Sequence, residues 1–143
     1  MTTKQIELVK NTWAIISRLD AVATGNLFYN RLFVIAPKVK PLFTKPMEEQ
    51  SRKLISMITY IVNKLDKLDN IIDEAGKLAR RHVQYGVEPG HYLIVGDALL
   101  WTLEQGLDNK WTEEVKEAWI KCYTILSQAM IESAYYTPLA KVA

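Results

Sequence analysis

Apolar residues recur along this chain every three or four positions, the spacing of one face of an α-helix. Each stretch follows a residue suited to begin a helix, and these residues are Thr2, Asp20, Pro46, Asp69, Pro89 and Thr112. Thr2 and Gln5 also have the spacing of a capping box. Gly86 and Gly106 are placed to end the fourth and fifth stretches. No stretch of useful length alternates as a strand does, so the pattern predicts an all-α chain.

Prolines and chain length set the organisation of these helices. Pro37 and Pro41 interrupt regular helix, so residues 37–46 are predicted to form a short turn of helix and a loop. The chain has 143 residues and neither an internal repeat nor a low-complexity linker, which suits a single domain over 1–143. We expect its core to span about residues 5–135 and its C-terminal tail to be frayed.

Composition and charge exclude several classes of protein. The formal net charge is only +2 and the cations are scattered, so nothing favours a nucleic-acid-binding protein. No apolar run approaches the ~18 residues of a membrane span, and the N-terminus lacks the apolar core of a signal peptide. Cys122 is the only cysteine, so no internal disulfide can form, and we expect a small core residue. These features predict a cytoplasmic protein.

Two residues break the helical pattern. Gly25 lies inside the second predicted helix, where glycine costs about 0.5–1 kcal/mol relative to alanine. We therefore expect another helix to approach Gly25 closely, with Ser51 as the candidate point of contact. Gln50 places a polar amide on an apolar stripe that continues through Leu54 and Ile58. It is either a solvent-exposed residue of the first turn or a side chain that faces inward for a reason.

His82 shares one face of its predicted helix with Leu78 and Ala79. Taken alone it is most simply a core histidine with a hydrogen-bond partner, and a metal ligand is the alternative. Tyr29 and Gln50 would face inward with it. The apolar residues around these three would be Phe28, Phe43, Leu54, Leu78, Val87 and Val95. One strong ligand, one hydroxyl and one amide in an apolar box fit a flat apolar cofactor with a reactive metal, whereas zinc would need three or four clustered ligands.

In the order and spacing of these residues, the chain resembles the bacterial single-domain globins, which are similar to the globin domain of flavohaemoglobins. The resemblance covers about residues 5–135. Five segments carry it by their order and spacing, namely 27–33 (LFYNRLF), 36–43 (APKVKPLF), 50–54 (QSRKL), 81–87 (RHVQYGV) and 91–96 (HYLIVG). It implies a globin fold of six to eight helices that enclose haem b (iron protoporphyrin IX) in a bacterial, cytoplasmic protein.

On one side of the porphyrin, the resemblance implies that His82 ligates the haem iron. Phe43 would stack on the ring, and Lys53 and Arg81 could approach the haem carboxylates. The other expected contacts with the cofactor are Leu54, Leu78, Val87, Tyr92 and Val95. Two alternatives stay open: Phe43 is plain core if His82 is not a ligand, and Lys53 and Arg81 equally suit a solvated face.

On the opposite side, the resemblance places Tyr29 and Gln50 beside a bound gas, together with Phe28 and Leu54. Tyr29 and Gln50 both offer a hydrogen-bond donor. A hydrogen bond to a charged acceptor is worth ~1.5–3 kcal/mol, so each donor could slow O₂ escape about ten- to hundred-fold. Two alternatives remain, that Tyr29 bonds only a main-chain carbonyl, or that Tyr29 or Gln50 itself binds the ferric iron. Gly25 and Ser51 match the close crossing of two globin helices.

Two departures from the flavohaemoglobin pattern bear on activity. Tyr92 matches a tyrosine that tunes the ligating histidine, but the position of the accompanying glutamate is Ala134, and Glu132 lies two residues early. Without an ionised partner the imidazole donates less electron density, which favours ligand binding over redox catalysis. We expect no flavin or nicotinamide domain to accompany this domain, and we therefore expect reduction to need a separate reductase.

The resemblance therefore favours reversible O₂ binding, for storage or transport, with NO and CO as further ligands and no catalytic residue assigned. The alternative is a nitric oxide dioxygenase that works with a separate reductase. A gas sensor would need a transmitter domain. A haem-free interaction module would leave His82, Phe43 and Tyr29 in globin order without a role.

Overall fold

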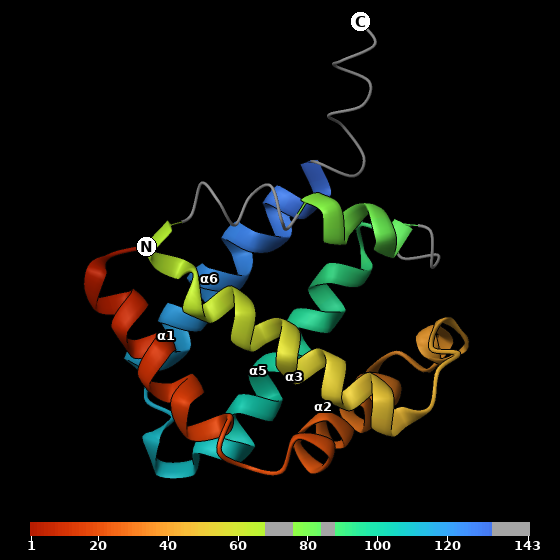
Figure 1. Ribbon diagram of the computed structural model, residues 1–143, viewed down its shortest axis with the longest axis horizontal. Coiled ribbons are helices and arrows are strands. Elements are labelled where there is room, and N and C mark those ends of the chain that lie inside the picture. The colour runs from red at the N-terminus through yellow and green to blue at the C-terminus, as the bar shows by residue number, and fades with distance from the viewer. Residues whose placement is uncertain (68–75, 84–87, 133–143) are drawn as a thin grey trace, which may run out of the picture.

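The computed structural model describes residues 1–67, 76–83 and 88–132, and all regular structure in these ranges is helical. The longer helices are α1 (Thr3–Ile16), α2 (Ala21–Ile35), α3 (Met47–Asn63), α5 (His91–Leu107) and α6 (Glu113–Ile131) (Figure 1). Short 3₁₀ helices are η1 (Pro37–Leu42), η2 (Leu65–Lys67) and η3 (Asp108–Lys110). Residues 76–83 are also helical. The prediction of an all-α chain is confirmed.

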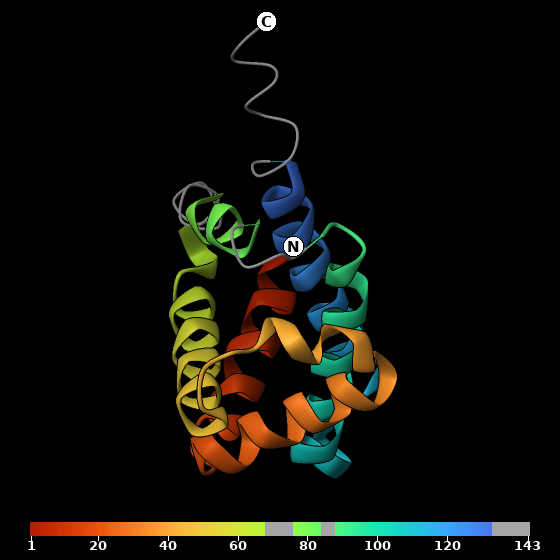
Figure 2. The same cartoon turned by 90° about the vertical axis from the view of Figure 1, so that its right-hand side faces the viewer.

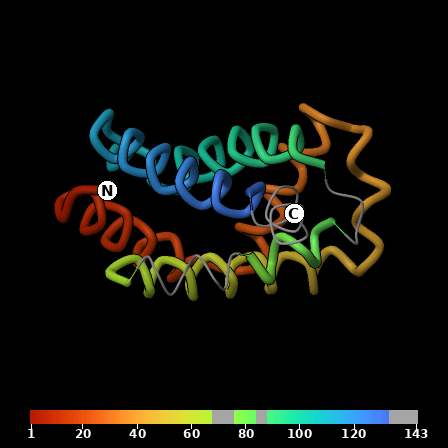
Figure 3. Tube along the Cα trace, turned by 90° about the horizontal axis from the view of Figure 1, so that it is seen from above, coloured from red at the N-terminus to blue at the C-terminus, as the bar shows by residue number. Residues whose placement is uncertain are grey.

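The longer helices form two layers joined by α2. Seen along the view of Figure 3, α5 and α6 lie side by side in one layer, and α1 and α3 lie in the other. α2 runs across one end of both layers and packs against α3 and α5 (Figure 2). The helical residues 76–83 lie on the α3 side in both views. Among the described residues, no helix is both long enough and apolar enough to cross a membrane.

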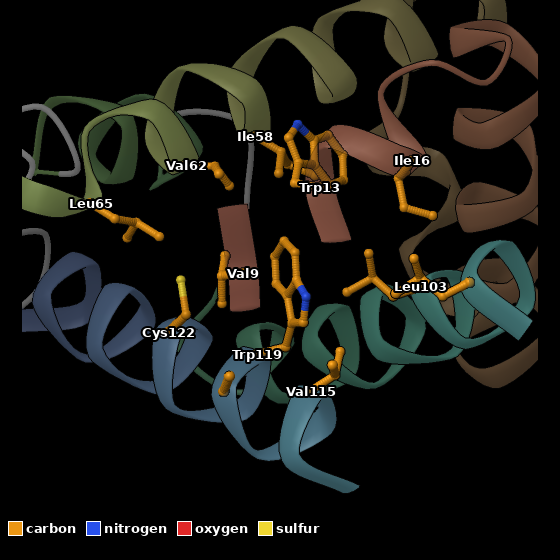
Figure 4. Packing of buried hydrophobic residues seen from close by; sticks show 12 residues of the cluster. Val9, Trp13, Ile16, Ile58, Val62, Leu65, Leu103, Val115, Trp119 and Cys122 are labelled. Atoms are coloured by element: carbon orange, nitrogen blue, oxygen red, sulfur yellow. The ribbon is translucent and has the colours of Figure 1, made fainter. Parts of the chain in front are cut away.

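The larger apolar core lies between these layers, around two tryptophans (Figure 4). Trp13 of α1 and Trp119 of α6 meet edge to face, with ring centroids 6.0 Å apart. The Trp119 indole Nε1 donates to the Thr12 hydroxyl at 2.9 Å, and the Trp13 indole donates to the Thr59 hydroxyl at 2.9 Å. Both buried indoles are therefore satisfied, and they tie α1 to α6 and to α3. Cys122 is 3% exposed in this cluster, which confirms it as a core residue.

Several helix ends follow the predicted capping chemistry. The Thr2 hydroxyl accepts a hydrogen bond from the Gln5 amide at 3.1 Å and the Gln5 side chain accepts from the Thr2 amide at 2.9 Å, so the capping box is confirmed. The Thr112 hydroxyl accepts from the Val115 amide at the start of α6. Asp20 is the N-cap of α2, although its side chain makes no capping bond.

The start of α5 differs from the prediction. Pro89 was expected in the first turn, but Pro89 and Gly90 form a turn and the helix begins at His91. The reason is local: the His91 and Tyr92 amides donate to the main-chain oxygens three residues earlier, those of Glu88 at 3.0 Å and Pro89 at 3.2 Å, which closes a turn before the helix. The expected helix boundaries at Asp69 and Gly86 lie outside the described residues.

The end of α5 also differs. Gly106 was expected to end this helix, but α5 continues through Leu107. Gly106 serves instead as a close contact, because a Cβ there would lie 2.5 Å from Ile16 Cδ1 of α1. Asp108 takes the positive φ, 50°, that follows the helix.

Candidate functional site

The helices α2 and α3 cross where Gly25 meets Ser51. A Cβ on Gly25 would lie 2.2 Å from the Ser51 Cβ, so the crossing leaves no room for a side chain at position 25. Ser51 is fully buried, and its hydroxyl donates to Asn26 Oδ1 at 3.0 Å. The contact expected between Gly25 and Ser51 is confirmed.

Tyr29 lies one turn after Gly25 and is buried, with 5% of its surface exposed. Three phenylalanine rings surround it, with centroids at 5.0 Å for Phe28, 6.1 Å for Phe33 and 5.2 Å for Phe43. Its hydroxyl donates to the main-chain oxygen of Gln50 at 3.5 Å, the outer limit of a hydrogen bond. Burial raises the pKa of Tyr29 to about 12, so the hydroxyl keeps its proton at neutral pH and acts as a donor.

A second apolar cluster builds the wall around Tyr29. Its buried members are Phe28, Tyr29, Leu32, Val39 and Ala98. Partly buried residues packed against it include Phe33, Phe43, Leu54, Ile94 and Val95. These residues come from α2, η1 and its following loop, α3 and α5. The structure thus brings together most of the apolar residues predicted to line the pocket.

His82 lies in the helical segment 76–83 and is partly buried. Its Nδ1 atom is 2.7 Å from the main-chain oxygen of Leu78, one turn earlier. A carbonyl oxygen can only accept, so Nδ1 must carry the hydrogen, and in the neutral ring the lone pair is on Nε2. A histidine that ligates a metal through Nε2 has this tautomer, with its other nitrogen bonded to a fixed acceptor.

The first turn of α5 is held from α6. Tyr92 is buried, and its main-chain oxygen accepts a hydrogen bond of 2.5 Å from the Tyr123 hydroxyl. The Tyr123 ring lies against Gly96, where a Cβ would be 2.7 Å from the ring. Burial raises the pKa of Tyr123, so its hydroxyl remains a donor. The Tyr123 side chain therefore holds the start of α5 against α6.

The remaining predicted residues lie nearer the surface or outside the described ranges. Lys53 is exposed and pairs with Glu49 at 3.0 Å, and Arg81 is exposed. A contact of either cation with haem carboxylates stays a prediction. Gln50 is partly buried. The predicted pocket residue Val87, and the Ala134 position, lie outside the described residues.

The donor set fits a haem rather than a metal held by protein ligands alone. In the described part of the chain, no group of three His, Cys, Asp or Glu side chains could hold a metal ion. His82 supplies one oriented nitrogen, and the Tyr29 cluster supplies aromatic and aliphatic surface. A porphyrin brings four nitrogens of its own, so one imidazole and apolar walls are what it requires from a protein.

A comparison with known families decides between the classes of protein that such a set of residues could serve. The model of the family described as Globin matches residues 26–130. The chain belongs to the globin family. Globins are haem proteins, so membership of the family implies that this globin binds haem.

Individual relatives agree with this family. A globin-like protein of Aquifex aeolicus is 31% identical over 131 residues, covering 92% of each chain. A flavohaemoprotein of Vibrio cholerae is 27% identical over 135 residues, covering 92% of this globin but only 34% of the relative. The chain therefore spans about a third of that flavohaemoprotein's length. The solved structure of a bacterial globin from Campylobacter jejuni superimposes with a TM-score of 0.79 at 28% identity, covering 93% of this chain and 96% of that one.

Three residues of this globin's site were not singled out from the sequence for the roles they have. Asn26 is the partner of Ser51, Phe33 stacks on Tyr29, and Tyr123 holds the Tyr92 main chain. Helical spacing offered a signal for Phe33, which lies one turn from Tyr29. The other two contacts join different helices, and only the fold brings them together.

Proposed function

We propose that this globin binds haem b through His82 and reversibly binds O₂ on the opposite side of the ring, as a protein that stores or carries O₂. The observation that carries the proposal is the bond from His82 Nδ1 to the Leu78 oxygen, because it gives the neutral ring the tautomer of a histidine that ligates through Nε2. Tyr29 supports it as a buried, protonated donor beside Gln50.

The residues that would hold the cofactor are His82 together with the apolar walls from Phe43, Leu54 and Val95. Lys53 and Arg81 are proposed to approach the haem carboxylates, and Lys53 would then exchange its partner Glu49 for one of them. When bound, the haem would supply an iron atom that binds a diatomic gas. The apolar walls would limit the water beside the cofactor.

Tyr29 and Gln50 would then discriminate between gases. The Tyr29 hydroxyl donates to the main-chain oxygen of Gln50 at 3.5 Å, which is a weak hydrogen bond. Rotating the hydroxyl toward a better acceptor would therefore cost little free energy. These two donors would stabilise O₂ more than CO, because O₂ held at a haem would be the better hydrogen-bond acceptor. The Gln50 amide adds a donor that does not titrate near neutral pH. These donors should slow the release of O₂ far more than that of CO.

An O₂ titration of the reduced, haem-loaded protein tests this function. We expect a stable oxygenated spectrum that returns to the deoxygenated one when O₂ is removed, over several cycles. Immediate oxidation to the ferric form without a stable oxygenated species would contradict an O₂ store or carrier.

The second candidate is a nitric oxide dioxygenase, favoured by the match to the globin part of a flavohaemoprotein. Such an enzyme combines bound O₂ with NO to give nitrate and must then be reduced, here by a separate reductase. Stopped-flow mixing of the oxygenated protein with NO, with and without a flavin reductase and NADH, distinguishes the O₂ carrier from the dioxygenase. Repeated turnover with the reductase favours the enzyme, and a single turnover under both conditions favours the carrier.

A further inference from the structure

We propose that Asn26 and Ser51 are positioning residues for the gas-binding pair, and that their partly buried hydrogen bond limits how far α2 can slide along α3. This bond would thereby set the separation of Tyr29 and Gln50. The inference rests on the proposed function, because that separation matters only if a gas binds beside the two residues.

The crossing of Gly25 and Ser51 limits how closely α2 and α3 approach each other. This contact is steric and includes no directional bond between the two residues. The Ser51 hydroxyl bond to Asn26 Oδ1 at 3.0 Å is directional, so it resists sliding. The steric contact and the hydrogen bond together define one arrangement of α2 on α3.

The hydroxyl at position 51 is not needed to fill space. An alanine there would keep the same Cβ at the crossing and would avoid burying a polar group. Ser51 is nonetheless fully buried with its hydroxyl bonded across the interface. A polar contact that packing does not require suits a role in selecting one arrangement of the two helices.

Short rigid connections link this bond to the gas-binding pair. Tyr29 lies three residues after Asn26 on α2, about 4.5 Å along the helix axis and on the same side of it. Gln50 directly precedes Ser51 on α3. A slide of the helices at the Asn26–Ser51 bond therefore displaces Tyr29 relative to Gln50 by nearly the same amount.

The Tyr29–Gln50 contact is sensitive to such a displacement. The Tyr29 hydroxyl is 3.5 Å from the Gln50 oxygen, where a hydrogen bond is barely formed. A slide of less than about 1 Å would either break this bond or shorten it to ordinary length. The orientation of the Tyr29 donor toward a bound gas would change with it.

The test uses the haem-loaded full chain with CO as the probe, because the infrared C–O stretching band of bound CO reports on nearby donors. Ser51→Ala and Asn26→Leu each remove one side of the bond. In both variants we expect the band to split or to move toward the band of Tyr29→Phe. We also expect O₂ dissociation to accelerate about threefold, as when an ordinary hydrogen bond is weakened by about half.

Two controls separate positioning from general stability. Asn26→Asp keeps an acceptor for the Ser51 hydroxyl and should keep the wild-type band. Ser17→Ala removes a surface hydroxyl that bonds the Ala14 carbonyl of its own helix and should also leave the band unchanged. Thermal unfolding of every variant is measured in parallel, because a purely structural role would lower the melting temperature and leave the band in place.

The outcomes distinguish this inference from the proposed function. If Tyr29→Phe moves the band while Ser51→Ala and Asn26→Leu leave it unchanged, the positioning role is wrong and the gas-binding role of Tyr29 stands. If Tyr29→Phe itself has no effect on the band or on O₂ release, the proposed function of Tyr29 fails and the inference fails with it.

Discussion

The imidazole of His82 and the main chain of Leu78 are joined by a hydrogen bond of 2.7 Å from Nδ1 to the carbonyl oxygen. The acceptor belongs to the preceding turn of the same helix, so the helix itself fixes both the tautomer and the plane of the ring. If His82 ligates the haem iron as proposed, its ring is oriented before the cofactor binds, which lowers the conformational entropy that binding would otherwise remove.

Removing the Tyr29 hydroxyl should release O₂ faster. In Tyr29→Phe we expect O₂ dissociation to rise about ten- to hundred-fold, since a hydrogen bond to a charged acceptor is worth ~1.5–3 kcal/mol, while CO dissociation changes far less. Laser photolysis and stopped-flow measurements give both rates. Tyr60→Phe is the matched control, because Tyr60 is 44% exposed on α3. Unchanged O₂ dissociation in Tyr29→Phe would mean that Tyr29 only packs.

Alanine at two different glycines should have opposite effects on stability. Gly25→Ala places a Cβ 2.2 Å from Ser51, so the two helices must separate, and we expect a loss of about 1–3 kcal/mol or more. A Cβ on Gly90 meets nothing within 4 Å, and its φ of −63° suits alanine, so Gly90→Ala should be neutral or stabilising by up to about 1 kcal/mol. Urea unfolding measures the free energy of unfolding of both variants. Equal changes in the two would refute the close crossing of α2 and α3 at Gly25.

The Thr12 hydroxyl should matter because it accepts the Trp119 indole hydrogen in the core. Thr12→Val keeps the shape but leaves a buried donor without its acceptor, which costs about 1–3 kcal/mol. Thr12→Ser retains the hydroxyl and should lose much less. Denaturant titration gives the free energy of unfolding of each variant. Wild-type stability in Thr12→Val would contradict a stabilising bond from Trp119 to Thr12.

Stability should fall at alkaline pH, in part through Cys122. Burial raises the pKa of this thiol to about 12, whereas an unfolded cysteine titrates near 8.5. Below the unfolded pKa both states hold the proton. Above the unfolded pKa, the unfolded chain releases a proton that the folded chain keeps. The free energy of unfolding therefore falls, by up to about 1.4 kcal/mol per pH unit, until the pH passes the folded pKa.

Cys122→Ala should therefore flatten the fall in unfolding free energy between about pH 9 and about pH 12. Tyr29 and Tyr123 add a similar loss above about pH 10, because burial raises both of their pKa values. Urea titrations across this range provide the measurement. An identical pH dependence in Cys122→Ala and wild type would show that the thiol is not protected by burial.

Local signals in the sequence predicted much of the fold. The capping residues Thr2 and Thr112 are recognisable because their side chains bond main-chain groups three residues away. Gly25 was informative because a glycine inside a helix needs a reason, and the crossing with Ser51 supplies it. The prediction that Gly106 ends its helix was wrong, because this glycine makes room for Ile16 inside α5.

The parts of the site that the sequence did not predict depend on contacts between helices. Nothing local marks Asn26 as the partner of Ser51, twenty-five residues away. The bond from Tyr123 to the Tyr92 main chain likewise requires α5 and α6 to lie side by side. By contrast, His82 and Leu78 are one turn apart, so their bond was within reach of helical geometry alone.

The most direct test of the whole account is a titration of the purified chain with hemin, followed by the Soret absorption. The chain has two histidines, which provide a matched pair of variants. We expect wild type and His91→Ala to bind hemin with equal stoichiometry and the same Soret band, and His82→Ala to lose or grossly change that band. A His82→Ala variant with the wild-type spectrum, or a wild-type chain that binds no hemin, would contradict this expectation.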